Sequence, residues 1–189
     1  NKLAQYVKLG LNGFNIPNSF YGSNKQLMIA AKDMQFPIIL KGIQTSLGKD
    51  NFLIKSIDEL EIVLEQNKKS NFVIQKFIPN SFDYRVLILG GKLGTVLKRI
   101  RQNKDDHRNN TALGALEVEQ PTPPAEMVEL SIKIANLLEK DIAGIDLIFD
   151  EVSQEYFVIE SNSKPCFTND VMVSSEIPQF AKYIDSVVG

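Results

Sequence analysis

The fold is decided by residues 144–162, which read GIDLIFDEVSQEYFVIESN. Two short runs rich in Ile, Val, Leu, Phe and Tyr flank the polar residues 151–154, and this pattern predicts a β-hairpin. With the loop centred near Ser153, Asp146 lies directly opposite Glu160. Asn162 shares their strand face, because side chains alternate along a strand. Since directly opposed Cβ atoms lie about 5 Å apart, three oxygen-bearing side chains are expected to crowd one patch of the sheet.

Two interpretations fit this oxygen-rich patch. Two carboxylates at so short a distance repel each other unless a cation lies between them, and oxygen ligands suit Mg²⁺. Solvated acids on a surface hairpin are the alternative, and that is the usual fate of Asp and Glu. Because apolar residues flank both Asp146 and Glu160, the sequence favours a metal site.

Length and composition set the class of protein. The chain of 189 residues allows one large domain or two small ones. A hydrophobic content of 43%, a charged content of 23% and a net charge of −2 fit a soluble globular protein and give no reason to expect nucleic acid or an anionic membrane as partner. No apolar run reaches 18 residues, so no transmembrane helix is expected. The single cysteine, Cys166, fits a reducing compartment, and we predict a cytoplasmic protein.

The order of predicted elements indicates an α+β fold. Short apolar strands are expected at residues 38–40, 52–54 and 71–75, with capped helices at about 23–34 and 56–66. A second hairpin spans residues 84–100 and turns at Gly90-Gly91, and helices follow Pro124 and Ile177. A boundary near Pro79 separates a smaller subdomain (20–78), preceded by an entry segment (1–19), from a larger subdomain (79–189). A ligand is expected between the two subdomains. The chain begins with Asn1 rather than with an initiator Met, so we expect it to be a piece of a longer protein.

Positive charge is local rather than general. Lys41 ends a buried-type strand, and the polar loop at 44–49 that follows offers backbone N–H groups to a phosphate, although an ordinary surface loop explains it equally well. Six potentially cationic side chains fall within 11 positions, namely Lys98, Arg99, Arg101, Lys104, His107 and Arg108. A solvated loop or a weak nucleic-acid contact is one interpretation. Clamping of an anionic substrate is the other, and the slightly negative net charge favours it.

The hairpin at 84–100 leaves one point of register open. Alternation places Asp83 and Arg85 on one face, where they can pair or meet a ligand. A two-residue turn puts Lys98 opposite Asp83, whereas a one-residue bulge puts Arg99 there. The sequence is compatible with both.

Seven features in register resemble the ATP-grasp superfamily, and within it the RimK-like branch of ribosomal-protein glutamate ligases. They are Lys41 after a strand, the small-residue loop at 44–49, Gln75-Lys76-Phe77-Ile78, Asp83-x-Arg85, Arg108-x-Asn110, Gly144-Ile145-Asp146 and Glu160-x-Asn162. The resemblance covers nearly the whole chain and implies an ATP-grasp fold, two α+β subdomains enclosing a nucleotide cleft, with the N-terminal preATP-grasp domain absent. Departures from the family pattern include Lys76 in place of Glu and Pro165-Cys166 in place of Pro-Gly, and they bear on the substrate more than on the nucleotide.

The resemblance implies a role for each matching residue. Lys2 and Lys41 would contact the nucleotide phosphates, with the loop around Ser46 closing over them. Residues Lys76, Phe77 and Ile78 would line the adenine pocket, and Asp83 would lie near the ribose. Arg108, Asn109 and Asn110 would reach the nucleotide and its reacting phosphoryl group, and Arg99 would face the developing acyl phosphate. The residues expected to hold one or two Mg²⁺ ions, for which Mn²⁺ can substitute, are Asp146, Glu160 and Asn162.

The implied activity is an ATP- and Mg²⁺-dependent ligase that joins a carboxylate to an amine through an acyl phosphate, with release of ADP and phosphate. Arg99 and Arg108 would be its catalytic residues. The expected partners are a small-molecule or peptide carboxylate and an amine acceptor, without nucleic acid or membrane, and many relatives associate as homo-oligomers. The alternative is a nucleotide-binding module without ligase activity of its own.

Overall fold

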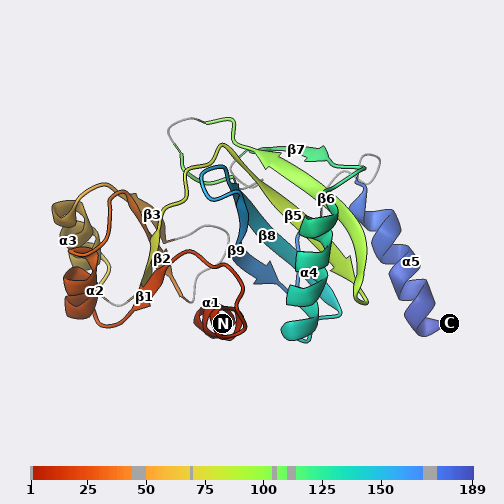
Figure 1. Ribbon diagram of the computed structural model, residues 1–189, viewed down its shortest axis with the longest axis horizontal. Coiled ribbons are helices and arrows are strands. Elements are labelled where there is room, and N and C mark those ends of the chain that lie inside the picture. The colour runs from red at the N-terminus through yellow and green to blue at the C-terminus, as the bar shows by residue number, and fades with distance from the viewer. Residues whose placement is uncertain (1, 44–49, 69, 104–105, 110–113, 168–173) are drawn as a thin grey trace.

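Two antiparallel sheets and five helices make up the described part of the chain (Figure 1). The computed structural model describes residues 2–43, 50–68, 70–103, 106–109, 114–167 and 174–189. The four-stranded sheet has the order β1-β4-β2-β3, from strands β1 (Ser19–Tyr21), β2 (Ile38–Gly42), β3 (Asn51–Ile54) and β4 (Phe72–Lys76). The five-stranded sheet has the order β7-β6-β5-β8-β9, from strands β5 (Phe82–Leu89), β6 (Lys92–Ile100), β7 (Leu116–Glu119), β8 (Ile142–Asp150) and β9 (Glu155–Asn162). This α+β arrangement confirms the predicted fold class.

Helices α2 (Asn24–Ala31) and α3 (Ile57–Gln66) cover the four-stranded sheet. The predicted cap of α2 is present, since the Ser23 side chain accepts from the Gln26 N–H and the Gln26 side chain accepts from the Ser23 N–H. In α3 the Ser56 hydroxyl accepts from the Glu59 N–H, as predicted, but the Glu59 carboxylate accepts from the N–H of Lys55, one residue earlier than a capping box requires. Both helices therefore begin where their sequences predict, and their apolar faces close a separate small core.

The five-stranded sheet packs one face on helix α4 (Ala125–Leu137) and on Leu9 of helix α1 (Lys2–Leu11). Its core residues alternate along the strands, as in Val86 and Ile88 of β5 and Ile145 and Leu147 of β8. Because successive side chains point to opposite faces, the residues between them project from the other face. That face turns toward the four-stranded sheet and carries the charged residues predicted for the site.

A β-bulge decides the register of the second hairpin. The pairing shifts between Leu87 and Ile88, which places Arg99 rather than Lys98 opposite Asp83. The residue skipped in this pairing is Gly94, where a Cβ would lie 3.1–3.2 Å from side-chain atoms of Leu89 and Leu87. A glycine therefore accommodates the extra residue in the strand.

The hairpin of β8 and β9 contains a bulge between Asp146 and Leu147, and the predicted pairing is present on the far side of this bulge from the turn. Asp146 pairs directly with Glu160, and Gly144 pairs with Asn162. A Cβ at Gly144 would lie 2.8 Å from the Cβ of Pro165, so only glycine lets the segment after β9 pass this closely over the sheet. Pro165 and the residues around it thereby become a wall of the cavity between the sheets.

Helix α1 is fixed to β9 by hydrogen bonds. The hydroxyl of Tyr6 donates to the carbonyl of Ile159 at 2.9 Å, and the side chain of Gln5 bonds both the N–H and the carbonyl of Ser161. The helix thus places Lys2 beside Glu160, with 3.7 Å between Nζ and Oε1. Helix α5 (Glu176–Val188) closes the other end of the sheet, where the Tyr183 ring approaches Gly90. None of the helices in the described residues has the length and apolarity needed to cross a membrane.

Candidate functional site

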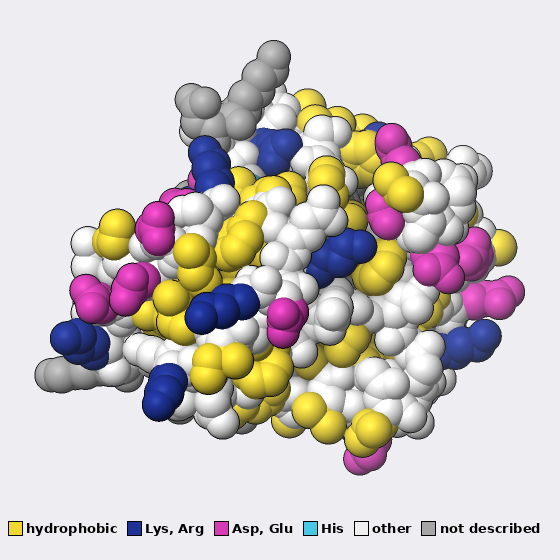
Figure 2. Space-filling view, turned by 60° about the vertical axis from the view of Figure 1, so that its left-hand side comes forward, with side chains coloured by type: hydrophobic (Ala, Val, Ile, Leu, Met, Phe, Trp, Pro, Cys, Tyr) yellow, Lys and Arg dark blue, Asp and Glu magenta, His cyan; other side chains and the backbone are white. Residues whose placement is uncertain are grey.

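A cavity of about 360 Å³ lies between the two sheets. It collects most of the residues expected at a nucleotide cleft, namely Lys2, Lys41, Lys76, Phe77, Ile78, Asp83, Arg99, Arg108, Asn109, Asp146, Glu160 and Asn162. Ser46 and Asn110, which were expected there too, fall outside the described residues. On the face turned forward in Figure 2, basic side chains stand among hydrophobic and acidic ones rather than in one continuous stripe.

One end of the cavity is formed by the strand-to-strand connection after β4. Ile78 is buried, Phe77 is half-buried, and the apolar side chains of Ile39 and Ile148 line the same space. Two buried acceptor atoms here, Oε1 of Gln75 and Oδ1 of Asn109, have no hydrogen-bond partner within the described residues. Because buried polar atoms are normally bonded, the cavity fits a ligand that is apolar at this end and that carries hydrogen-bond donors.

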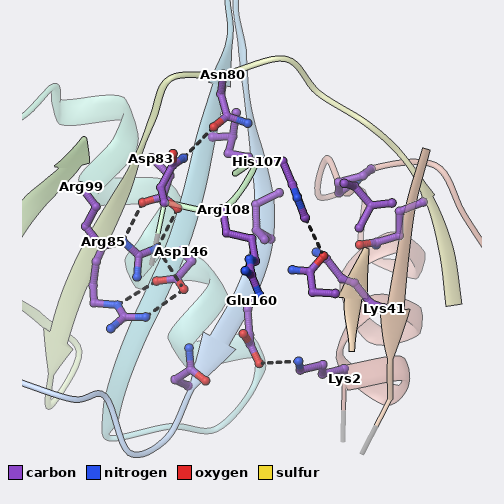
Figure 3. Close-up of a pocket in the computed structure, with 18 of the residues that line it drawn as sticks. Lys2, Lys41, Asn80, Asp83, Arg85, Arg99, His107, Arg108, Asp146 and Glu160 are labelled. Carbon is purple, nitrogen blue, oxygen red and sulfur yellow. Dashed lines mark hydrogen bonds and ion pairs between the residues drawn. The ribbon is translucent and has the colours of Figure 1, made fainter. Parts of the chain in front are cut away.

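The other end is cationic. Lys41 at the end of β2 and Lys2 of α1 face Glu160 from the side of the small sheet, and Arg108 enters from the connection between β6 and β7 (Figure 3). Burial, together with the positive charge of Lys2, lowers the pKa of Lys41 to about 8, although Glu160 and Asp146 oppose the shift. A partly desolvated cation gains more from meeting a phosphate than a hydrated one, so this end fits the anionic part of a nucleotide.

The lowered pKa of Lys41 allows its predicted contact with the nucleotide phosphates to be tested through pH. Below about pH 8 the ammonium is already formed in the free protein, whereas above it a proton must be taken up on binding. The dissociation constant of ADP is therefore expected to stay level up to about pH 8 and then to rise by up to about tenfold per pH unit. Calorimetry between pH 7 and pH 10 measures this. Lys41→Arg, which stays protonated throughout, should give a level profile, and a level profile in the wild type would contradict the assignment.

The connection from β6 to β7 reaches across to the small sheet. His107 Nε2 lies 3.1 Å from Oδ1 of Asn51 on β3, and Arg108 donates to Asp106 through Nε and Nη2 at 2.9 and 2.7 Å. Burial lowers the pKa of His107 to about 4, although Asp106 works against the shift. The imidazole is thus neutral near pH 7 and acts as a hydrogen-bonding group between the two sheets. The sequence offered no signal for this contact.

Four charged side chains form a linear network on the cavity face of the five-stranded sheet, in the order Asp83, Arg99, Asp146 and Arg85 (Figure 3). Arg99 donates to both oxygens of Asp83 at 2.6 and 2.8 Å, and Arg85 donates to both oxygens of Asp146 at 2.9 and 3.0 Å. A third contact of 3.2 Å joins Nη2 of Arg99 to Oδ2 of Asp146. Burial alone would raise the pKa of Asp146, but Arg99 and Arg85 hold it below its ordinary value. Arg85 is the member that we did not assign to the site, although its position two residues after Asp83 placed it on the right face.

Asp146, Glu160 and Asn162 all line the cavity and carry oxygen-bearing side chains. Asp146 and Glu160 are paired across the strands, and Asn162 lies two residues beyond Glu160. Among the described residues no group of three or more His, Cys, Asp or Glu side chains is gathered as a metal cluster. Carboxylate and amide oxygens with few protein ligands are the chemistry of Mg²⁺ sites that share the ion with a phosphate. Both oxygens of Asp146 already accept from Arg85, so Asp146 would hold the ion with the lone pairs that these bonds leave over.

Comparison with known proteins places nearly the whole chain in one family. Residues 5–186 match the family model described as the RimK-like ATP-grasp domain. The α-aminoadipate–LysW ligase LysX of Saccharolobus solfataricus is 28% identical over 93% of this chain and 65% of its own length. The β-citrylglutamate synthase B of Mus musculus is 26% identical over 88% of this chain and 44% of its own length. The chain therefore spans less than two thirds of these curated relatives.

Solved structures have the same fold. The ATP-grasp ligase PsnB, in complex with a variant of its minimal precursor, Mg and ADP, matches 99% of this chain and 57% of its own chain with a TM-score of 0.75 at 15% identity. The D-alanine–D-alanine ligase of Bacillus anthracis matches 100% of this chain and 66% of its own with a TM-score of 0.73 at 18% identity. At such identities the likeness establishes the fold alone.

Proposed function

Because the chain belongs to the RimK-like ATP-grasp family, we propose that it is the nucleotide-binding and catalytic part of an ATP- and Mg²⁺-dependent carboxylate–amine ligase. One observation carries the proposal. A single cavity joins a cationic end at Lys41 and Arg108 to an oxygen-donor set at Asp146, Glu160 and Asn162. A phosphate chain and a divalent cation need that combination together.

The proposed reaction has two steps. A substrate carboxylate oxygen attacks the γ-phosphorus of ATP, the bond to the β-phosphate oxygen breaks, and ADP and an acyl phosphate form. An amine then attacks the acyl carbon, phosphate leaves with the bonding electrons, and the amine loses a proton to give an amide. Bound Mg²⁺ would neutralise charge on the phosphate oxygens.

The protein contributes positioning and fixed charge to the first step. Lys41 and Arg108 would hold the phosphate chain. Arg99 would face the acyl phosphate, and its bonds to Asp83 and Asp146 fix its guanidinium in advance. Donors that are fixed before the reaction stabilise a developing anion without reorganisation, which supports a catalytic role for Arg99.

Relatives named as ligases indicate the kind of substrate. LysX is named for joining α-aminoadipate to LysW, and a structure of PsnB holds a precursor peptide. We therefore expect an amino acid or a peptide to take part as carboxylate or amine. A homo-oligomeric state, a cytoplasmic location and the absence of nucleic-acid binding stay predictions.

A coupled assay of ADP release tests the proposed function. The protein is incubated with Mg-ATP and a panel of amino acids and dicarboxylates as paired carboxylates and amines. ADP release should rise with a matching pair and stop when EDTA removes the metal. Release that persists in excess EDTA would contradict the scheme. Binding of Mg-ATP without any amine-stimulated release would instead favour the alternative, a nucleotide-binding module without ligase activity.

A further inference from the structure

The amide of Asn109 ends a chain of hydrogen bonds that starts at the backbone carbonyl of Ile78, a residue that lines the cavity. Nδ2 of Asn80 donates to the carbonyl of Ile78 at 2.7 Å, and Nδ2 of Asn109 donates to Oδ1 of Asn80 at 2.6 Å. Asn109 is only 6% exposed and lines the cavity. Its remaining atom, Oδ1, is buried and has no partner in the part of the chain that the structure describes.

This chain of hydrogen bonds fixes which end of the Asn109 amide is free. The carbonyl of Ile78 can only accept, so Asn80 must present its Nδ2 to Ile78 and its Oδ1 to Asn109. Asn109 must in turn present its Nδ2 to Asn80. The free group is therefore an acceptor, and a ligand that satisfies it must donate a hydrogen bond.

The donors of an adenine nucleotide are few. Phosphate oxygens are acceptors and would be repelled by Oδ1, so the phosphate chain belongs at Lys41 and Arg108. The exocyclic amine lies on the edge of the base. Residues 76–78, which are expected to line the adenine pocket, would meet that edge through their backbone. Asn109 is separated from that backbone by the whole Asn80 amide. The donors that remain are the ribose hydroxyls.

Asp83, the residue predicted for the ribose from the family resemblance, already has hydrogen-bond partners, so it is not the unsatisfied acceptor of this region. Both of its carboxylate oxygens accept from Arg99, at 2.6 and 2.8 Å. We propose, as a refinement that rests on the proposed nucleotide-binding function, that Oδ1 of Asn109 accepts a hydrogen bond from a ribose hydroxyl. Asn109 thereby makes the cavity selective for ribonucleotides over deoxyribonucleotides.

Calorimetry with Mg-ADP, Mg-2′-deoxy-ADP and Mg-3′-deoxy-ADP tests this selectivity. One of the two deoxynucleotides lacks the hydroxyl that would bond to Asn109, and it leaves the buried Oδ1 unpaired in the wild type. That deoxynucleotide should therefore bind about 5- to 100-fold more weakly than ADP. Equal dissociation constants for all three ligands would overturn the proposal.

Two variants locate the effect. Asn109→Leu should weaken ADP binding toward that of the affected deoxynucleotide and bring the ratio of their dissociation constants close to one. Asn136→Leu makes the same change at an exposed position on α4 and should leave the ratio as in the wild type. A wild-type ratio in Asn109→Leu would refute the assignment. If Asn109→Leu does not fold, the wild-type ratio and Asn109→Ala decide.

The outcomes separate this inference from the function beneath it. If ADP and its two deoxy analogues bind with equal dissociation constants, the role of Asn109 is overturned but the nucleotide site is not. Failure of ADP itself to bind, in a protein with a cooperative thermal transition, overturns both.

Discussion

Replacing Asp146 with asparagine is expected to lower Mg²⁺-dependent ADP release by about 10²- to 10³-fold. The carboxylate of Asp146 is opposite Glu160 in the proposed metal site and also pairs with Arg85 and Arg99. An amide has the same shape but lacks the negative charge that both roles require. The measurement is the steady-state rate of ADP release as a function of Mg²⁺ concentration.

Asp141→Asn is the matched control for this change. Asp141 immediately precedes the same strand and is exposed, so its substitution should leave the rate and its Mg²⁺ dependence unchanged. Wild-type activity in Asp146→Asn would remove Asp146 from the metal site.

Replacing Arg99 with methionine is expected to lower the free energy of unfolding by about 3–5 kcal/mol. Arg99 is 4% exposed and links Asp83 to Asp146, so its loss leaves two buried carboxylates without the guanidinium between them. Removing one partner of a buried ion pair lowers the stability of the fold, because the remaining charge stays desolvated. A decrease in Tm of roughly 10 °C is the expected result in a thermal melt.

Lys92→Met, at the exposed start of the same strand, should change Tm by no more than about 1–2 °C, because surface substitutions usually alter stability by less than ~0.5 kcal/mol. Equal stability of Arg99→Met and Lys92→Met would show that the network contributes nothing to the fold. It would also remove the reason to regard the Arg99 guanidinium as fixed in advance of the reaction.

Local periodicity predicted the pairing of Asp146 with Glu160 but not the way in which it arises. With Asp150 opposite Glu155, plain alternation would place Ile159 opposite Asp146, and a bulge between Asp146 and Leu147 places Glu160 there instead. The register of the other hairpin was undecided between Lys98 and Arg99, because a bulge has no periodic signature. Gly94 was the available signal, since the strand accommodates an extra residue where no side chain has to pack.

Contacts between distant segments could not be predicted in this way. His107 meets Asn51 and Asn109 meets Asn80 because irregular connections cross the space between two sheets, and neither connection has a period. The engagement of both Asp83 oxygens by Arg99 also depends on the bulge. These contacts changed the residue that we propose for the ribose, whereas the residues proposed for the phosphates and the metal are those expected from the sequence and its family resemblance.

The acyl phosphate is the central element of the proposed chemistry, and hydroxylamine trapping tests it most directly. The protein is incubated with Mg-ATP, hydroxylamine and a panel of amino acids, dicarboxylates and short peptides, and hydroxamate and ADP are measured together. We predict that a matching carboxylate yields hydroxamate and ADP in equal amounts, and that Asp146→Asn yields neither above background. Release of ADP with a carboxylate that leaves no hydroxamate would contradict the acyl phosphate intermediate.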